Sequence, residues 1–82
     1  MKTKRNQEKH ITEQVGRQIR KLRISKGITQ LELAVEATMD KSYIVNIESG
    51  KANPSLRKIA RLADALDVDV VVLFEWARRN RQ

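Results

Sequence analysis

The chain has 82 residues, of which 40% are hydrophobic and 33% are charged, so it is long enough for one small domain. It contains no cysteine and one histidine, which excludes a disulfide framework, a cysteine nucleophile and a zinc site built from these residues. Its longest apolar run is Val70–Phe74 and no export signal is recognisable. We therefore expect a cytoplasmic domain with no cofactor and no membrane segment.

Positive charge is concentrated in blocks along the chain. Seventeen Lys and Arg against ten Asp and Glu give a formal net charge of +7. Residues 1–26, 41–61 and 77–82 are basic, whereas residues 27–40 and 62–76 are acidic. Such blocks produce a directional electric field that attracts polyanions, among them nucleic acid. Many basic proteins bind no nucleic acid, however, so the charge alone leaves this question open.

The first predicted elements are a basic arm and an amphipathic helix. Residues 1–10 are polar apart from the first methionine, so we expect a flexible arm, followed by a domain over residues 11–79 and a short tail over 80–82. Apolar residues then recur at spacings of four, four and three, which predicts a helix that ends at Gly27. These residues are Ile11, Val15, Ile19 and Leu22.

A pair of short helices is predicted next. The segment TQLE, from Thr29 to Glu32, has the sequence of a capping box and begins a helix over about residues 29–37. A break follows, and Asp40 is a suitable N-cap for a helix over about residues 40–49. Ala34 is small enough for the place where the two helices cross. This arrangement is typical of a helix-turn-helix, whose second helix enters the major groove of DNA.

The remainder of the chain predicts two more helices. Ser55 is the expected cap of a fourth helix, and Asp69 that of a fifth helix that runs through Arg79. The expected buried stripe of the fourth helix is Leu56, Ile59, Ala60, Leu62, Ala63 and Leu66. Three valines at 70–72 favour a strand, but no partner strand is predicted. We therefore predict an all-α fold of five helices.

Many residues between Val15 and Phe74 stand at offsets that resemble one known family. They are Gly27, Thr29, Gln30, Leu33, Ala34, Ala37, Ser42, Tyr43, Ile44, Ile47, Glu48, Gly50, Asn53, Pro54, Ser55, Leu56, Ile59, Ala60, Ala63, Leu66, Val68, Leu73 and Phe74. The pattern resembles helix-turn-helix regulators of the Cro and phage-repressor type, the xenobiotic-response-element family. The resemblance implies a compact, five-helix, lambda-repressor-like DNA-binding domain whose third helix reads the DNA. Thr38 and Asp67 depart from it, because the family usually has glycine at both positions.

The resemblance and the side-chain chemistry together assign candidate DNA contacts. The candidate base contacts are Lys41, Ser42, Val45 and Asn46. The candidate contacts to the DNA backbone are Gln30, Tyr43, Ser49, Lys51, Asn53 and Arg57. Each of these residues also has a simpler interpretation as a solvated surface residue, and packing explains Tyr43 as readily as DNA contact does.

Two further groups have structural roles in this interpretation. Arg23 and Glu48 match a pair that forms a salt bridge between helices 1 and 3 in some relatives. Val71, Val72 and Trp76 are more apolar than the fifth helix of a monomer needs, so we expect a homodimer built on them; alternatively all three belong to the core.

The predicted function is a transcriptional regulator that binds double-stranded DNA at a palindromic operator as a dimer. The sequence shows no nucleophile–base pair, phosphate loop or metal cluster, so we expect neither an enzyme nor a metal site. We also expect no domain that senses a small molecule. Two alternatives remain open, an antitoxin or a restriction–modification controller protein that also acts through a protein partner, with exposed Leu31 and Val35 as the signature of a partner surface. A weaker alternative is binding to nucleic acid without sequence preference.

Overall fold

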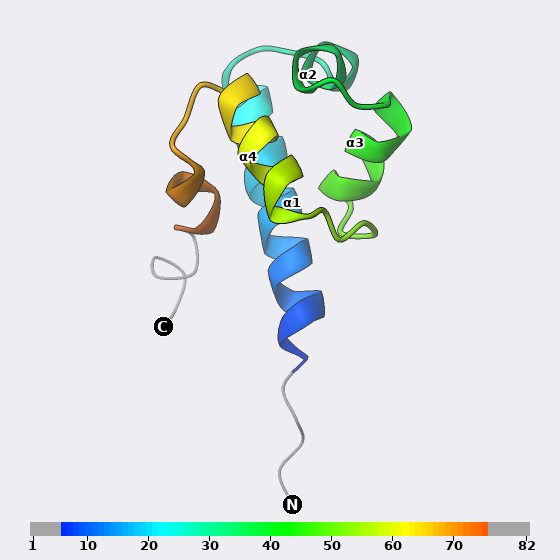
Figure 1. Cartoon of the computed structure of the whole chain (residues 1–82), viewed down its shortest axis with the longest axis vertical. Coiled ribbons are helices and arrows are strands. Elements are labelled where there is room, and N and C mark those ends of the chain that lie inside the picture. Colours follow the sequence, from blue (N-terminus) through cyan, green and yellow to red (C-terminus); the bar gives the residue numbers. More distant parts are fainter. Residues whose placement is uncertain (1–5, 76–82) are drawn as a thin grey trace, which may run out of the picture.

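The computed structural model describes residues 6–75 of the chain. In this part of the chain there are four α-helices, followed by a short 3₁₀ helix. These elements are α1 (Gln7–Ser25), α2 (Gln30–Ala37), α3 (Lys41–Glu48), α4 (Leu56–Ala65) and η1 (Val70–Phe74). Helix α1 packs against α3 and η1, which lie on opposite sides of it in Figure 1, and α4 packs against α2 and η1. Residues 6–75 contain no strand, as expected for an all-α fold.

Helix α1 begins earlier than the sequence pattern predicted. Residues 7–10 were expected to belong to the arm, but they form the first turn of α1. The side chain of Asn6 caps this turn by accepting a hydrogen bond from the backbone N–H of Lys9 over 3.2 Å. A capping side chain and polar residues with good helix propensity can extend a packed helix without any apolar contact. The first apolar residue of the sequence pattern therefore does not mark where α1 begins. Residues 1–5 of the predicted arm lie outside the described residues.

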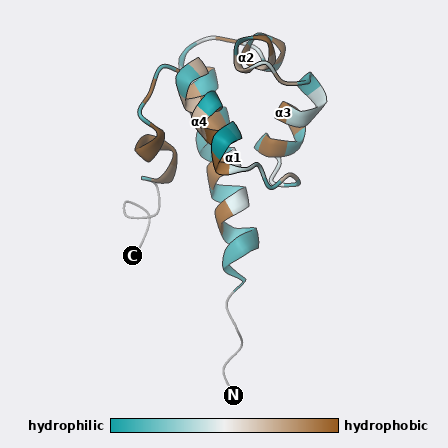
Figure 2. Cartoon of the chain, viewed as in Figure 1, coloured by the Kyte–Doolittle hydropathy of each residue, from teal (hydrophilic) through white to brown (hydrophobic). Residues whose placement is uncertain are grey.

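Within residues 6–75, twelve buried apolar side chains form the core between the helices. They are Val15, Ile19, Leu33, Ala34, Ala37, Ile44, Ile47, Ile59, Leu62, Ala63, Leu66 and Leu73. In Figure 2 the first turn of α1 is hydrophilic, whereas η1 is strongly hydrophobic. The predicted stripe of α4 was too wide, because Leu56 is 76% exposed and Ala60 is exposed as well. Only the residues at spacings of three and four from Ile59 face the core.

The capping box at the start of α2 is formed as predicted. The Thr29 hydroxyl accepts a hydrogen bond from the Glu32 backbone N–H over 3.0 Å, and the Glu32 carboxylate accepts one from the Thr29 N–H over 2.8 Å. Asp40 occupies the N-cap position of α3, but its side chain makes no capping hydrogen bond. Helix α3 is therefore held in place by its buried residues rather than by its cap.

The turn between α2 and α3 keeps a left-handed residue although it has no glycine. Thr38 has φ 59° and ψ 52°, and Asp67 after α4 has φ 58°. The Met39 N–H donates to the Ala34 carbonyl over 2.8 Å, which closes the turn. The residue that departs from the family thus adopts the backbone conformation that glycine would adopt, at a cost in strain.

The predicted fifth α-helix is instead a 3₁₀ helix of five residues. Asp69 does cap it, since its carboxylate accepts a hydrogen bond from the Val71 N–H over 3.0 Å. Successive β-branched valines crowd the preceding turn of an α-helix, and a short 3₁₀ turn is enough to bury Leu73. Gln18 of α1 donates to the Val72 carbonyl over 3.0 Å and ties η1 to α1. Residues 76–79, the predicted end of this helix, lie outside the described residues.

Candidate nucleic-acid interface

The exposed side of α3 carries the four candidate base contacts. Ile44 and Ile47 are buried, so the core fixes the rotation of this helix. At about 100° per residue, the positions 41, 42, 45 and 46 lie within an arc of about 140°. All four of these side chains are exposed: Lys41, Ser42, Val45 and Asn46. The structure therefore presents an ammonium, a hydroxyl, a methyl-bearing group and an amide on one convex helix surface.

The loop between α3 and α4 follows this surface directly. Ser49, Lys51 and Asn53 are exposed in the loop, and Arg57 is exposed in the first turn of α4. The Asn46 carbonyl accepts hydrogen bonds from the backbone N–H groups of Lys51 over 2.8 Å and Ala52 over 3.1 Å. These bonds fix the loop to the end of α3, so its cationic and polar side chains are carried on a backbone of defined shape.

Arg23 and Glu48 form a buried ion pair behind this surface. Arg23 Nε donates to Glu48 Oε2 over 2.7 Å, and Nη2 donates to Oε1 over 3.1 Å. Arg23 Nη1 also donates to the Ile28 carbonyl over 2.8 Å. The hydrogen bonds that Arg23 donates to Glu48 raise the pKa of Arg23, burial of the guanidinium opposes this rise, and the negative charge of Glu48 adds to it. The ion pair and the bond to Ile28 join α1, the α1–α2 loop and α3.

Gln30 at the start of α2 has a contact that the sequence did not reveal. Its Nε2 donates to Glu48 Oε1 over 3.1 Å, so this candidate phosphate contact also belongs to the ion-pair network. Eighteen positions separate the two residues, and no local pattern indicates such a contact. Only the crossing of α2 and α3 brings them together.

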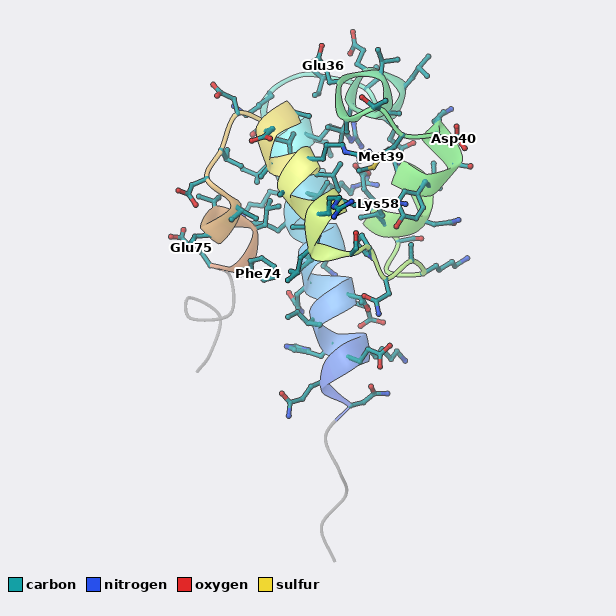
Figure 3. All side chains as sticks on the ribbon, in the orientation of Figure 1. Glu36, Met39, Asp40, Lys58, Phe74 and Glu75 are labelled. Atoms are coloured by element: carbon teal, nitrogen blue, oxygen red, sulfur yellow. The ribbon has the colours of Figure 1, made fainter. Side chains whose placement is uncertain are left out.

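Lys58 is a second residue that sequence reasoning missed. Its Nζ lies 4.6 Å from the ring centroid of Tyr43, a distance that allows a cation–π interaction. In Figure 3, Lys58 extends from α4 toward α3. The two half-buried side chains, together with Asn46 and Arg61, line a groove between α4 and the α2–α3 pair. The structure thus gives Tyr43 a packing partner on α4.

The residues expected at a dimer interface are placed only in part. Val71 is 59% exposed on η1, whereas Val72 is half-buried, and Trp76 lies outside the described residues. On α2, Leu31 and Val35 are 56% and 69% exposed. Within residues 6–75, no three potential metal ligands come together. Among the helices of that part of the chain, none has the length and apolar character required to span a membrane.

The fold and the exposed third helix define the class of helix-turn-helix proteins. The helix-turn-helix family matches residues 19–73, which is more than half of the chain. The protein therefore belongs to this family, in the group of the Cro and C1 repressors, which are DNA-binding transcriptional regulators.

Two curated relatives illustrate the range of this group. The chain is 38% identical over 56 residues to the immunity repressor protein of Bacillus phage phi105. This alignment covers 68% of this chain and 39% of the repressor. It is also 39% identical over 62 residues to the control protein C.BamHI of Bacillus amyloliquefaciens. That alignment covers 74% of this chain and 76% of C.BamHI. The chain spans about two fifths of the length of the phage repressor and of the regulator SlrR of Bacillus subtilis.

Solved structures of restriction–modification controller proteins share the fold. C.AhdI from Aeromonas hydrophila is 40% identical with a TM-score of 0.75, over 77% of this chain and 96% of C.AhdI. C.Esp1396I, solved as a tetramer in complex with its natural 35 base-pair operator, is 32% identical with a TM-score of 0.77. That alignment covers 84% of this chain and 91% of C.Esp1396I.

Proposed function

We propose that this protein is a sequence-specific transcriptional regulator that binds a palindromic operator as a homodimer, with α3 in the major groove. The observation that carries the proposal is the exposed arc of Lys41, Ser42, Val45 and Asn46, held outward by buried Ile44 and Ile47. Lysine suits guanine O6 and N7, asparagine suits adenine N6 and N7, and the valine methyl groups suit the thymine methyl. These side chains carry the chemistry of base recognition.

Phosphate contacts are proposed at two places beside this arc. One is Gln30 at the N-terminus of α2, and the other is the loop with Ser49, Lys51 and Asn53 together with Arg57 in the first turn of α4. Such contacts fix the register of the protein on DNA, while the bases supply specificity. Because the cationic side chains displace counterions, the affinity falls steeply as salt rises. Occupancy of the operator, without covalent chemistry, is then the mechanism of regulation.

The test is a selection of binding duplexes from a random pool at about 150 mM salt, combined with sedimentation of the free protein. The expected result is an enriched inverted repeat and a dimer mass. Lys41→Ala should then relax the preference at one position of each half-site and weaken binding by about 1–3 kcal/mol. If the wild-type protein enriches no sequence at any salt, the chain is not a sequence-specific regulator.

Among the narrower functions, that of a restriction–modification controller protein has the better support. The similarity to C.AhdI extends over 96% of that protein, whereas the match to the phage repressor covers 39% of its length. The controller proteins with solved structures, C.AhdI and C.Esp1396I, are thus similar to this chain over 96% and 91% of their own length. The check is whether the selected operator lies upstream of restriction and modification genes, and whether the protein alters their transcription.

An antitoxin function rests on a different observation. Leu31 and Val35 form an exposed apolar pair on α2, which is more apolar surface than a solvated helix requires. An antitoxin should form a stable complex with the product of an adjacent gene when the two are co-expressed. Leu31→Asp should abolish that complex and leave DNA binding intact; a loss of DNA binding in the same variant would argue against a separate partner surface.

A further inference from the structure

The buried carboxylate of Glu48 holds two different side chains. Its Oε2 accepts from Arg23, while its Oε1 accepts from both Arg23 and Gln30, each over 3.1 Å. The Glu48 side chain is only 1% exposed, so water has little access to compete for these bonds. The amide of Gln30 bonds to Glu48, and the residue as a whole is half-buried, so part of it is open to solvent.

The contact with Glu48 selects one orientation of the Gln30 amide. If the amide turned over, its carbonyl oxygen would face the carboxylate, and two groups that can only accept hydrogen bonds would repel each other. The carboxylate therefore keeps Nε2 inward. One hydrogen of Nε2 is used in this bond, which leaves the second hydrogen to donate elsewhere.

Gln30 is also the first residue of α2, where the helix leaves backbone donors unused. The N–H groups of Glu32 and Leu33 are bonded to Thr29, but the first N–H groups of a helix have no acceptor within it. Together with the positive end of the helix dipole, they favour an anion at this place. The remaining donor of the Gln30 amide lies at the same helix end.

We propose that Glu48 is a positioning residue for DNA binding, which holds the Gln30 amide ready to donate to a backbone phosphate. This inference rests on the proposed function, because it requires the start of α2 to lie against DNA. A side chain that is already held loses less conformational entropy when it binds. Glu48 thus acts in binding through Gln30, in addition to its ion pair with Arg23.

Glu48→Gln tests this inference because two effects of the substitution change the affinity for DNA in opposite directions. Removal of a negative charge raises the net charge, and long-range electrostatics alone then strengthens binding to DNA. If Glu48 positions Gln30, the substitution weakens binding about 3- to 10-fold. The measurement is an anisotropy titration with the duplex that the wild-type protein selects, at a temperature where circular dichroism shows every variant folded.

Two further variants complete the experiment. Glu36→Gln removes the same charge from an exposed position of α2 and should not weaken binding. Gln30→Met should weaken binding about 10-fold, and Glu48→Gln should cause no further loss in that background. Additive losses, or tighter binding by Glu48→Gln alone, overturn the inference while the proposed function stands. A wild-type protein that binds no duplex overturns both.

A second measurement applies if Glu48→Gln does not fold. In the wild-type protein without DNA, the side-chain amide of Gln30 should be as rigid by NMR relaxation as that of Gln18, which donates to the Val72 carbonyl over 3.0 Å. A Gln30 amide that moves freely on the nanosecond timescale would contradict positioning by Glu48.

Discussion

At the scale of single residues, the ion pair of Arg23 and Glu48 links stability to the candidate interface. The guanidinium bonds to the carboxylate and to the Ile28 carbonyl, and the carboxylate bonds to Gln30. Each polar group in this buried network therefore depends on the others. Loss of one member leaves its partners desolvated without compensation.

Glu48→Ala should destabilise the fold by about 3–5 kcal/mol, because it leaves the Arg23 charge buried and unpaired. The measurement is the free energy of unfolding from urea titration at neutral pH. The substitution should lower stability before it changes DNA specificity. The molecules of this variant that remain folded should therefore keep the sequence preference of the wild type. A melting temperature equal to that of the wild type would contradict a structural role for the pair.

Thr38→Gly should stabilise the protein by about 1 kcal/mol. Thr38 is exposed with φ 59°, so glycine removes the left-handed strain without the loss of a packed side chain. Asp67→Gly is the matched control at φ 58° and should give a smaller gain, since aspartate tolerates this region better. Thermal melts of the two variants provide the comparison. A lower melting temperature for Thr38→Gly would show that the threonine is not strained.

At the scale of elements, α1 and α3 approach each other closely at Gly16. Gly16 is buried, and a Cβ atom added there would collide with the Ile47 carbonyl oxygen. This close approach sets the distance between α1 and α3, and hence how far the exposed face of α3 projects from the domain. A glycine inside a helix lowers helix propensity, and here the packing explains its presence.

Gly16→Ala should destabilise the domain by about 1–3 kcal/mol, although alanine is the better helix former. Gly27→Ala is the contrasting variant. It meets no atom within 4 Å but has φ +70°, so its cost of about 1 kcal/mol comes from the backbone alone. Unfolding titrations distinguish the two, and chemical shifts of α3 should change only in Gly16→Ala. A stabilised Gly16→Ala variant would contradict the close packing of α1 and α3.

At the scale of the whole molecule, the exposed valines of η1 lie apart from the candidate interface. Helices α3 and η1 pack on opposite sides of α1, as Figure 1 shows. A two-fold axis near η1 would leave the exposed faces of both α3 helices open. To read successive major grooves, the two α3 helices of the dimer must lie about 34 Å apart. The proposed homodimer is compatible with this arrangement.

Val71→Asp should convert the dimer to a monomer and weaken binding to an inverted repeat at least 10-fold, because both half-sites are no longer bound together. Val71 is 59% exposed, so the melting temperature of the monomer should change little. Val35→Asp, at a 69% exposed position of α2, is the control and should leave the sedimentation mass unchanged. An unaltered mass for Val71→Asp would place the dimer interface elsewhere.

Local features of the chain were predictable because the signals lie within a few residues. The capping box at Thr29 and the cap at Ser55 were identified from the sequence, as was the buried face of α3 at Ile44 and Ile47. The candidate base contacts followed from the same periodicity and from the family resemblance. Their contact with DNA remains a prediction. Element ends were less predictable, as Asn6 and the start of α1 illustrate.

The sequence by itself determined the helix-turn-helix family, the positions of α2 and α3, and which side of α3 is exposed, because helical periodicity and caps are local properties. Only the tertiary structure decided that Gln30 bonds to Glu48, that Lys58 stacks on Tyr43, and that η1 is a 3₁₀ helix tied to α1. These contacts join residues far apart in the chain. They depend on how the helices cross in space, and no short-range pattern of amino acids encodes that crossing.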